Sequence, residues 1–228
     1  HGCSDHNYET INYQRCFDGC FVFGEKEVVE DFHIPGGIPS NDDLINYKNI
    51  EKKHILIITN LLGNQPSFTD HLGFKFKNFD EVFFNEVNLL DLQKKYKKPI
   101  IIKIKSKEDQ DYKKNIEYLK NLLPPELIFE ILVDVEDDNL LIAQSEIVIG
   151  APSTLALKPI QLKIPTVLVK GYGQTSLFKD YKGLVDLKYN QIVKALESPP
   201  DLEFIDKTIT GGLGFNSIDY YIHYIEQI

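Results

Sequence analysis

The chain has 228 residues, of which 43% are hydrophobic and 26% are charged, an ordinary composition for a globular protein. This length fits one domain, or one domain with part of a second. The formal net charge of -9, with Arg15 as the only arginine, argues against a general nucleic-acid binder, which needs a basic face. The longest apolar runs, such as residues 100–102 and 146–150, are far shorter than the ~20 residues that cross a bilayer.

The start of the chain and its cysteines add further expectations. No basic region followed by an apolar stretch opens the sequence, so no secretory signal is expected and a cytoplasmic location is favoured. The chain has no Met and opens at His1, which is typical of an excerpt from a longer polypeptide. The cysteines Cys3, Cys16 and Cys20 are odd in number and close together, so we expect reduced thiols rather than a disulfide framework.

From His54 onward, β-branched runs alternate with helical stretches, a pattern typical of βα units whose sheet is covered on both faces. Buried strands are predicted at residues 54–59, 99–103, 127–133, 147–150 and 166–169. Helices are predicted at residues 85–96, 109–123, 139–144, 153–162 and 190–196. The predicted fold class is therefore α/β, a Rossmann-like parallel sheet with helices on both faces.

The two ends of the chain differ from this central pattern. Residues 20–23 predict a short strand, residues 26–32 a helix, and the prolines and glycines at 35–39 a stiff turn. We place a domain boundary there, with residues 1–36 as the remnant or edge of an N-terminal domain and residues 37–228 as the Rossmann-like domain. Beyond the glycines at 211–214, residues 217–228 predict a helix whose apolar face should dock on a neighbouring element.

The segment from Ser145 to Val169 is the most informative for function. It predicts a buried strand ending at Gly150, the turn Ala151-Pro152-Ser153-Thr154, and a helix that begins near Ser153. Ser153 or Thr154 would cap that helix, and the free amides of its first turn suit a phosphate group such as a diphosphate. A helix cap without any ligand fits the same residues, and the segment alone does not separate the two interpretations.

Four pieces of this region resemble the donor-binding half of glycosyltransferases with the two-domain GT-B fold. They are Glu136–Ala143, Ser145–Gly150, Pro152-Ser153-Thr154 and Ile164-Pro165-Thr166-Val167. Upstream, His1-Gly2, Phe17-Asp18 through Gly24-Glu25, and Gly37-Ile38-Pro39-Ser40-Asn41-Asp42 resemble, in order, segments of the glycerophosphotransferases that use CDP-glycerol. The UDP-N-acetylglucosamine 2-epimerase-like enzymes share this architecture, and the resemblance therefore implies a GT-B-type fold. It also implies that residues 1–36 are the remnant or edge of an acceptor-side domain and that residues 37–228 are the donor nucleotide-binding domain.

The resemblance also implies roles for single residues. Ser153 and Thr154 match the residues that hold the donor diphosphate, with Gly150 and Pro152 in the same donor-binding turn. Gly63 follows the first strand of the donor domain, where the backbone in these proteins approaches the donor phosphates. His1 matches a histidine at the interdomain cleft, which would act as a general base on an acceptor hydroxyl, and a frayed terminus is the alternative for it.

Two positions depart from the pattern of that family. Where related sequences often carry a Glu that binds ribose hydroxyls, this chain has Lys158, a cation that cannot accept those hydrogen bonds. Where glycerophosphotransferases tend to have K-x-H-P, this chain has Lys103 and Lys105, which could contact a phosphate or simply form a solvated strand end. Charged Lys105 cannot transfer the proton that a histidine would, which puts glycerol phosphate chemistry in doubt.

Three other signals carry less weight. The Cys and His residues near the N-terminus lack the spacing of a zinc site. The resemblance implies a transfer in which a helix N-terminus and basic side chains stabilise the leaving diphosphate, so no metal or other cofactor is expected. The acidic run Glu136–Asp138 is interpreted as the start of a helix, capped by Asp138 or Asn139 at its beginning. The loop with Gly171, Gly173 and Gln174 follows the last strand and is predicted to lie on the donor side, but it is no dinucleotide fingerprint.

These observations favour one function and leave two alternatives. The favoured function is a GT-B-type transferase that moves a sugar or polyol phosphate from a nucleotide-diphosphate donor, a nucleotide sugar or CDP-alcohol, to a glycan or polyol acceptor hydroxyl. Such chemistry serves surface glycan or polymer synthesis, and a peripheral membrane contact of the full-length protein stays open. The alternatives are a non-catalytic binding or structural protein with this fold and a nucleotide-sugar 2-epimerase-like enzyme.

Overall fold

The computed structural model describes residues 19–59, 79–104, 112–133, 135–170, 176–209 and 211–227. A six-stranded parallel sheet forms the centre of the molecule, in the order β5-β4-β3-β6-β7-β8. Its strands are β3 (His54–Thr59), β4 (Ile100–Ile104), β5 (Phe129–Leu132), β6 (Ser145–Gly150), β7 (Thr166–Val169) and β8 (Leu184–Val185). The predicted parallel α/β sheet is confirmed, and β8 is the described strand of this sheet that the sequence pattern missed.

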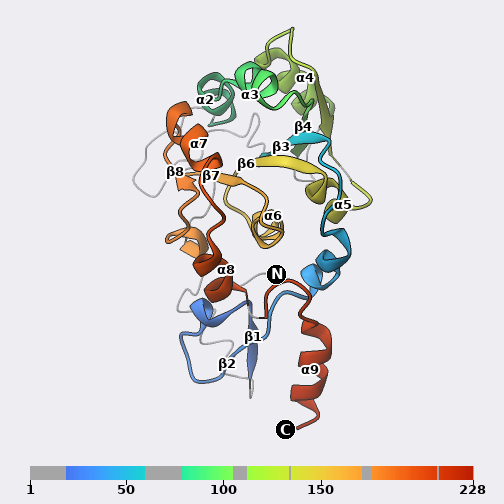
Figure 1. Ribbon diagram of the computed structural model, residues 1–228, viewed down its shortest axis with the longest axis vertical. Coiled ribbons are helices and arrows are strands. Elements are labelled where there is room, and N and C mark those ends of the chain that lie inside the picture. The colour runs from blue at the N-terminus through green and yellow to red at the C-terminus, as the bar shows by residue number, and fades with distance from the viewer. Residues whose placement is uncertain are drawn as a thin grey trace.

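Helices cover both faces of this sheet, because successive residues of each buried strand point to opposite sides. Ile55 and Ile57 pack in one cluster with the helices α2 (Phe79–Glu86), α3 (Leu89–Tyr96), α4 (Tyr112–Leu122) and α7 (Tyr189–Leu196). Leu56 and Ile58 point to the other face, against α5 (Asp138–Ala143), while α6 (Leu157–Gln161) and α8 (Leu202–Thr208) cover that face nearer β7. Figure 1 shows α2, α3 and α4 above the sheet and α6 below it.

The helices predicted after His54 are present, with one division. The stretch predicted as a single helix over 85–96 consists of the end of α2 and the whole of α3, separated at Val87 and Asn88. The side chain of Asn88 accepts a hydrogen bond from the backbone amide of Asp91, so this residue caps α3 and starts a new helix. The seven-residue helix α8 is an element that the sequence pattern did not predict.

The N-terminal part of the described chain forms a separate small sheet. The predicted strand at 20–23 is β1 (Cys20–Val22), which pairs in parallel with β2 (His33–Pro35). The predicted helix over 26–32 is wrong, because only one 3-10 turn, η1 (Glu25–Glu27), forms. Val28 and Val29 are exposed, so no apolar stripe holds a helix there, and a turn closed by the amide of His33 on the carbonyl of Glu30 leads into β2.

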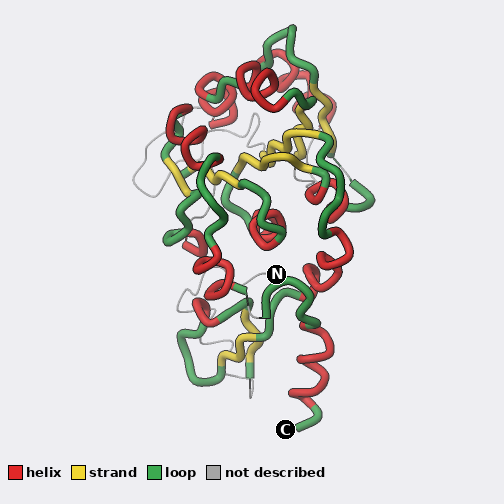
Figure 2. Tube along the Cα trace, viewed as in Figure 1, coloured by secondary structure: helices red, strands yellow, loops and turns green. Residues whose placement is uncertain are grey.

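This small sheet is packed onto the C-terminal part of the chain, and Figure 2 shows it at the lower end of the molecule. Helix α9 (Ser217–Ile225) lies against β1, where the rings of Tyr221 and Phe21 stack with centroids 3.9 Å apart. The Tyr221 hydroxyl also donates to the carbonyl of Gly37 at 2.9 Å. The predicted docking of this helix is thus made by its tyrosines, and its isoleucines, at 218, 222 and 225, stay at least half exposed.

The remaining connection is η2 (Pro39–Tyr47), a 3-10 helix between the small sheet and β3. Its buried Asn41 donates to Oε1 of Gln161 in α6 at 3.0 Å, which ties this segment to that helix. Among the described residues, no helix is long and apolar enough to cross a membrane.

Candidate functional site

The strand order of the large sheet defines a switch point between β3 and β6. From β3 the chain first builds outward through β4 and β5, and then returns to build β6, β7 and β8 on the opposite side. In open parallel sheets, ligands bind in the crevice outside the carboxyl ends of the two strands where the order reverses. The turn after β6 leaves the sheet at this place, and its Ala151 amide donates to the carbonyl of Ile58 at 3.0 Å.

Gly150, the last residue of β6, is fixed by packing against β3. A Cβ at this position would lie 2.9 Å from both the carbonyl carbon and the Cβ of Ile58, and closer still to the Ile58 carbonyl oxygen. Backbone atoms cannot swing aside as a flexible side chain can, so only glycine fits here. The close approach of the two strands therefore accounts for Gly150 without a ligand, and its predicted contact with a donor stays a prediction.

Beyond Gly150 the chain makes a short turn and enters a helix in two steps. Ala151 and Pro152 are buried, and the helical run begins as the 3-10 turn η3 (Thr154–Ala156), which continues directly into α6. Thr154 is exposed at the start of this run. The first amides of a helix have no acceptor within the helix itself, so they point out toward the carboxyl edge of the sheet.

Ser153 occupies the cap position of this helix, but its side chain makes no capping hydrogen bond. Its Oγ is buried and has no hydrogen-bond partner among the described residues. The prediction that Ser153 or Thr154 caps the helix through its side chain is therefore wrong for Ser153. A buried hydroxyl without a partner costs stability, and a ligand oxyanion at the head of this helix would supply the missing acceptor.

Two lysines meet the first turn of α5 at the same edge of the sheet. Lys103, near the end of β4, is only 8% exposed, and its Nζ lies 3.1 Å from Oδ1 of Asp138. Lys158, in the first turn of α6, donates from Nζ to Oδ1 of Asn139 at 2.7 Å. Lys103 is therefore not the solvated strand end that was one of its two interpretations, and its contact with a phosphate stays a prediction.

Asp137 holds the start of α5 in place. Its Oδ1 accepts a hydrogen bond from the amide of Leu140 at 2.9 Å, and its Oδ2 accepts one from the hydroxyl of Tyr47 at 2.8 Å. These hydrogen bonds, that of the Leu140 amide first, lower the pKa of Asp137 below its ordinary value. The interpretation of the acidic run as a helix start is confirmed, with Asp137 as the capping residue instead of Asp138 or Asn139.

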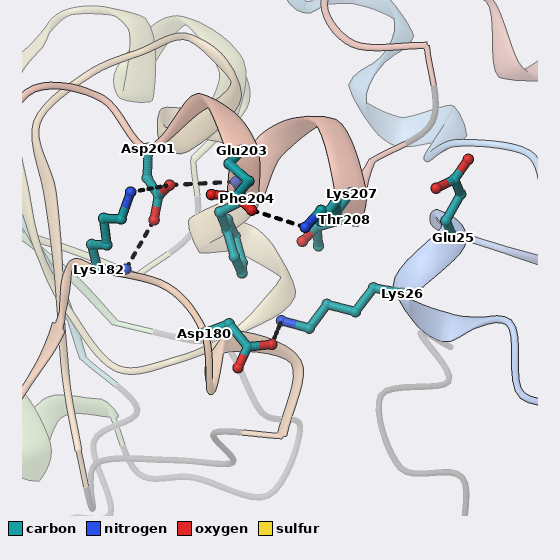
Figure 3. A pocket seen from close by; sticks show the side chains of 9 residues that line it. All are labelled: Glu25, Lys26, Asp180, Lys182, Asp201, Glu203, Phe204, Lys207 and Thr208. Carbon is teal, nitrogen blue, oxygen red and sulfur yellow. Dashed lines mark hydrogen bonds and ion pairs between the residues drawn. The ribbon is translucent and has the colours of Figure 1, made fainter.

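A cavity of about 520 Å³ lies elsewhere, between η1, α8 and the segment that precedes β8 (Figure 3). Its three lysines already have carboxylate partners: Lys26 with Asp180 at 3.0 Å, Lys182 with Asp201 at 3.5 Å, and Lys207 with Glu203 at 2.9 Å. Because these charges are compensated, the cavity is poorly suited to a free diphosphate. A groove of about 680 Å³ runs along the opposite, amino edge of the sheet, lined in part by Lys52, Glu146 and Pro165.

The structure places the predicted site residues in two groups. Six lie at the carboxyl edge of the sheet or at the head of α6: Lys103, Gly150, Pro152, Ser153, Thr154 and Lys158. The others lie outside the described residues: His1, Gly63, Lys105, Gly171, Gly173 and Gln174. Asn139 and Tyr47 were missed as members of this edge, because only the fold brings them there. Within the described ranges, no group of three or more His, Cys, Asp or Glu is placed to hold a metal ion.

No protein-family model and no curated protein matches the chain. Solved structures do resemble it, among them the UDP-GlcNAc 2-epimerase from Methanocaldococcus jannaschii, with a TM-score of 0.62 and 15% identity over 100% of this chain and 68% of that one. The UDP-GlcNAc 2-epimerase from Neisseria meningitidis bound to UDP-GlcNAc gives a TM-score of 0.55 at 14% identity, over 94% of this chain and 62% of that one.

The wall teichoic acid polymerase TagF gives a TM-score of 0.55 at 15% identity, over 96% of this chain and 61% of the polymerase. At such identities the likeness is one of fold, and the chain spans less than two thirds of the last two proteins. Both kinds of protein belong to the groups that the sequence motifs pointed to. The chain therefore has the Rossmann-like α/β fold of the GT-B group to which the UDP-GlcNAc 2-epimerases and TagF belong.

Proposed function

We propose that the chain is the donor-binding part of a GT-B-type transferase, which moves a sugar or polyol phosphate from a nucleotide-diphosphate donor to an acceptor hydroxyl. The observation that supports this most directly is the buried Ser153 hydroxyl, which lacks a partner among the described residues at the head of a helix beside the switch point. An anion with strong acceptor oxygens satisfies both the hydroxyl and the outward-pointing amides. Surface glycan or polymer synthesis is the process in which we place this transfer.

In this proposal, hydrogen-bond donors that the fold holds in place stabilise the diphosphate as it leaves. Ser153, Thr154 and the first amides of the helical run stabilise the charge that develops on the leaving group, without a bound metal. Gly63, Lys105, Gly171, Gly173 and Gln174 are proposed as further donor contacts, and His1 as the general base for the acceptor hydroxyl. The proposed donors are a nucleotide sugar or a CDP-alcohol, and the proposed acceptor is a glycan or polyol.

The proposed organisation has residues 1–36 on the acceptor side and residues 37–228 as the donor-binding domain. In its support, the described residues before 36 form a two-stranded sheet of their own, which shares no strand with the large sheet. We place the protein in the cytoplasm, where nucleotide-activated donors are made, with a peripheral membrane contact in the full-length protein.

Ligand-induced stabilisation tests the proposal. A thermal-shift panel would contain UDP, CDP, GDP and ADP and their common sugar or alcohol conjugates. A ligand at a hundred times its Kd stabilises the folded state by about 2.7 kcal/mol, which for a domain of this size is a shift of roughly 5–10 °C. We expect such a shift with one nucleoside diphosphate. If no ligand of the panel raises the melting temperature, and a longer form of the protein gives the same result, the donor site is contradicted.

Ser153→Ala makes this test specific. Removing a buried hydroxyl that lacks a partner should leave the unliganded protein as stable as before or slightly more stable, while nucleotide binding weakens. A lost hydrogen bond to a charged group is worth about 1.5–3 kcal/mol, or roughly a tenfold to hundredfold loss of affinity. Ser198→Ala is the matched control, because its exposed hydroxyl donates only to the carbonyl of Lys194.

Two other functions use the same fold. In favour of a non-catalytic binding protein, Lys103 and Lys158 already contact α5, where a transferase would need groups free for its donor. In favour of an epimerase, UDP-GlcNAc 2-epimerases are among the similar structures. Without an added acceptor, an epimerase converts the donor into its C2 epimer or, where water enters the reaction, into free sugar and UDP. A transferase needs the acceptor, and a non-catalytic protein binds the donor and leaves it intact.

A further inference from the structure

The cavity of about 520 Å³ lies where three separate parts of the chain meet: η1, the segment between η4 (Ser176–Phe178) and β8, and α8. Sites for small molecules typically have about 300–1,000 Å³, so this volume is sufficient for one. The cavity shares no described residue with the proposed donor site, and its wall includes both the small N-terminal unit and the Rossmann-like fold (Figure 3). It is therefore a candidate site for a second ligand.

The charges in the wall of this cavity nearly cancel. Among the described residues that line it, four carboxylates face three lysines, and each lysine forms an ion pair with one of the carboxylates. The carboxylate left over is that of Glu25. A polyanion would therefore meet one uncompensated negative charge and, in the described wall, only lysines that already have a carboxylate partner. This class of ligand does not suit the cavity.

Lys26 is a fixed part of the wall. Figure 3 shows its side chain reaching from η1 to Asp180, where Nζ lies 3.0 Å from Oδ2. The same Nζ donates to the carbonyl of Leu177 at 3.0 Å and lies 4.9 Å from the centroid of the Phe204 ring. Because three contacts hold this ammonium group, this side of the cavity is already formed without a ligand.

The other two ion pairs keep unused hydrogen-bonding capacity. An ammonium group has three donors and a carboxylate about four acceptor positions, and one contact per pair leaves most of them free. The side chains of Lys182 and Lys207 are 74% and 65% exposed, and that of Glu203 is 68% exposed. Donors and acceptors thus lie next to each other on the exposed side of the wall. This arrangement suits hydroxyl groups, because each hydroxyl both donates and accepts.

Thr208 adds an independent observation. It is the last residue of α8, lines the cavity and is completely buried. Its Oγ1 has no hydrogen-bond partner among the described residues. A buried hydroxyl without a partner costs stability, and a ligand hydroxyl can both donate to it and accept from it.

We propose that this cavity binds a neutral polyol, a sugar or a sugar alcohol, through hydrogen bonds to the paired charges of its wall and to Thr208. The inference goes beyond the proposed function, because the site lies outside the donor site and needs no nucleotide. A neutral hydroxylated ligand uses the free donors and acceptors and leaves the ion pairs intact. An apolar ligand would instead cover charged groups without replacing their water.

Titrations followed in two-dimensional amide NMR spectra test the proposal. The neutral probes are glucose, N-acetylglucosamine and ribitol, and the charged relatives are glucuronate and, at pH 6.5, glucosamine. We expect a neutral probe to bind with a Kd of roughly 1–10 mM, which is typical of a small polar ligand, and the charged relatives to bind several-fold more weakly. The amide signals of Lys182, Phe204 and Thr208 should shift, while that of Thr154 at the head of α6 stays in place. The comparison of glucose with ribitol shows whether the site takes a sugar ring or a linear polyol.

Variants assign the binding to this cavity. Thr208→Val has nearly the same shape and lacks the hydroxyl, and it should weaken polyol binding about threefold to tenfold without lowering the melting temperature of the free protein. Lys207→Met removes donors from the exposed side of the wall and should weaken binding at least twofold, which keeps the test open if the first variant does not fold. Ser198→Ala and Lys194→Met are the matched controls, since both side chains are exposed and neither lines the cavity.

Each result decides for or against the polyol site. If none of the neutral probes shifts the signals around the cavity, or if glucuronate or glucosamine binds more tightly than glucose, the proposal is overturned. A folded Thr208→Val protein that binds the polyol as tightly as the parent overturns it too. None of these results touches the donor site, which UDP and CDP test at the head of α6.

Discussion

Replacing Gly150 with alanine is expected to destabilise the protein strongly, although its backbone is ordinary extended strand. The added Cβ would lie 2.9 Å from the carbonyl carbon and the Cβ of Ile58, whereas carbon atoms in good contact stay about 3.5–4.0 Å apart. Overpacking of a well-packed core costs about 1–3 kcal/mol, and the clash here involves backbone of the neighbouring strand. We therefore expect a loss of about 3 kcal/mol.

Equilibrium urea denaturation measures this loss, and Gly212→Ala is its control. Gly212 has φ +64, and a Cβ added there would have no neighbouring atom within 4 Å. Alanine at this position should therefore reduce stability only through its left-handed backbone conformation, by about 1 kcal/mol. In melting temperature the two variants should fall by roughly 6–12 °C and 2–4 °C, respectively. If Gly150→Ala were no less stable than Gly212→Ala, the close packing of β6 on β3 would not be what requires glycine.

Three more outcomes follow from contacts of single side chains. Burial lowers the pKa of His54, and the neutral ring donates from Nε2 to the carbonyl of Leu141. The buried neutral ring therefore contributes its whole stabilisation above pH about 6.5, the ordinary pKa of histidine, and this stabilisation decreases as the pH falls below that value. Urea midpoints at pH 7.5 and pH 5.5 should therefore differ less in His54→Gln than in the parent protein, and an equal difference would contradict this role. Asp137→Ala removes the cap of α5 and the bond to Tyr47 and should cost about 1–2 kcal/mol in urea denaturation, with Asp137→Asn losing clearly less. Ile222→Ser on α9 should change the melting temperature by less than about 2 °C, because this side chain is half exposed. A larger drop would show that Ile222 is packed against other residues of the protein.

The central sheet was predictable because its strands are buried on both faces. Runs such as residues 54–59 consist mainly of β-branched residues, and such runs indicate buried parallel strands when helical stretches separate them. The strand β8 escaped prediction since it has only two residues. The short helix α8 was missed although Asp201, after two prolines, gives a start signal and accepts a hydrogen bond from the amide of Phe204.

The candidate site was predictable only in its local part. The turn from Gly150 to Thr154 follows from the sequence of a strand, a proline and a helix start. Whether the Ser153 hydroxyl would bond to its own helix could not be read from that pattern, because capping depends on the backbone angles of the turn. The approach of Lys103 and Lys158 to α5 joins three segments that are separate in sequence, and no periodicity encodes such a contact.

The junction at Gly24 has a consequence for motion in a longer protein. A Cβ there would lie 2.5 Å from the carbonyl oxygen of Thr208 and 2.9 Å from the amide nitrogen of Ile209, so the turn after β1 touches the end of α8 backbone to backbone. Such a contact leaves no room for sliding, and Lys26 reinforces it by donating to the carbonyl of Leu177 at 3.0 Å. The small β1–β2 sheet and the large sheet should therefore move together as one rigid body. Any hinge about which a cleft opens and closes must then lie outside this junction.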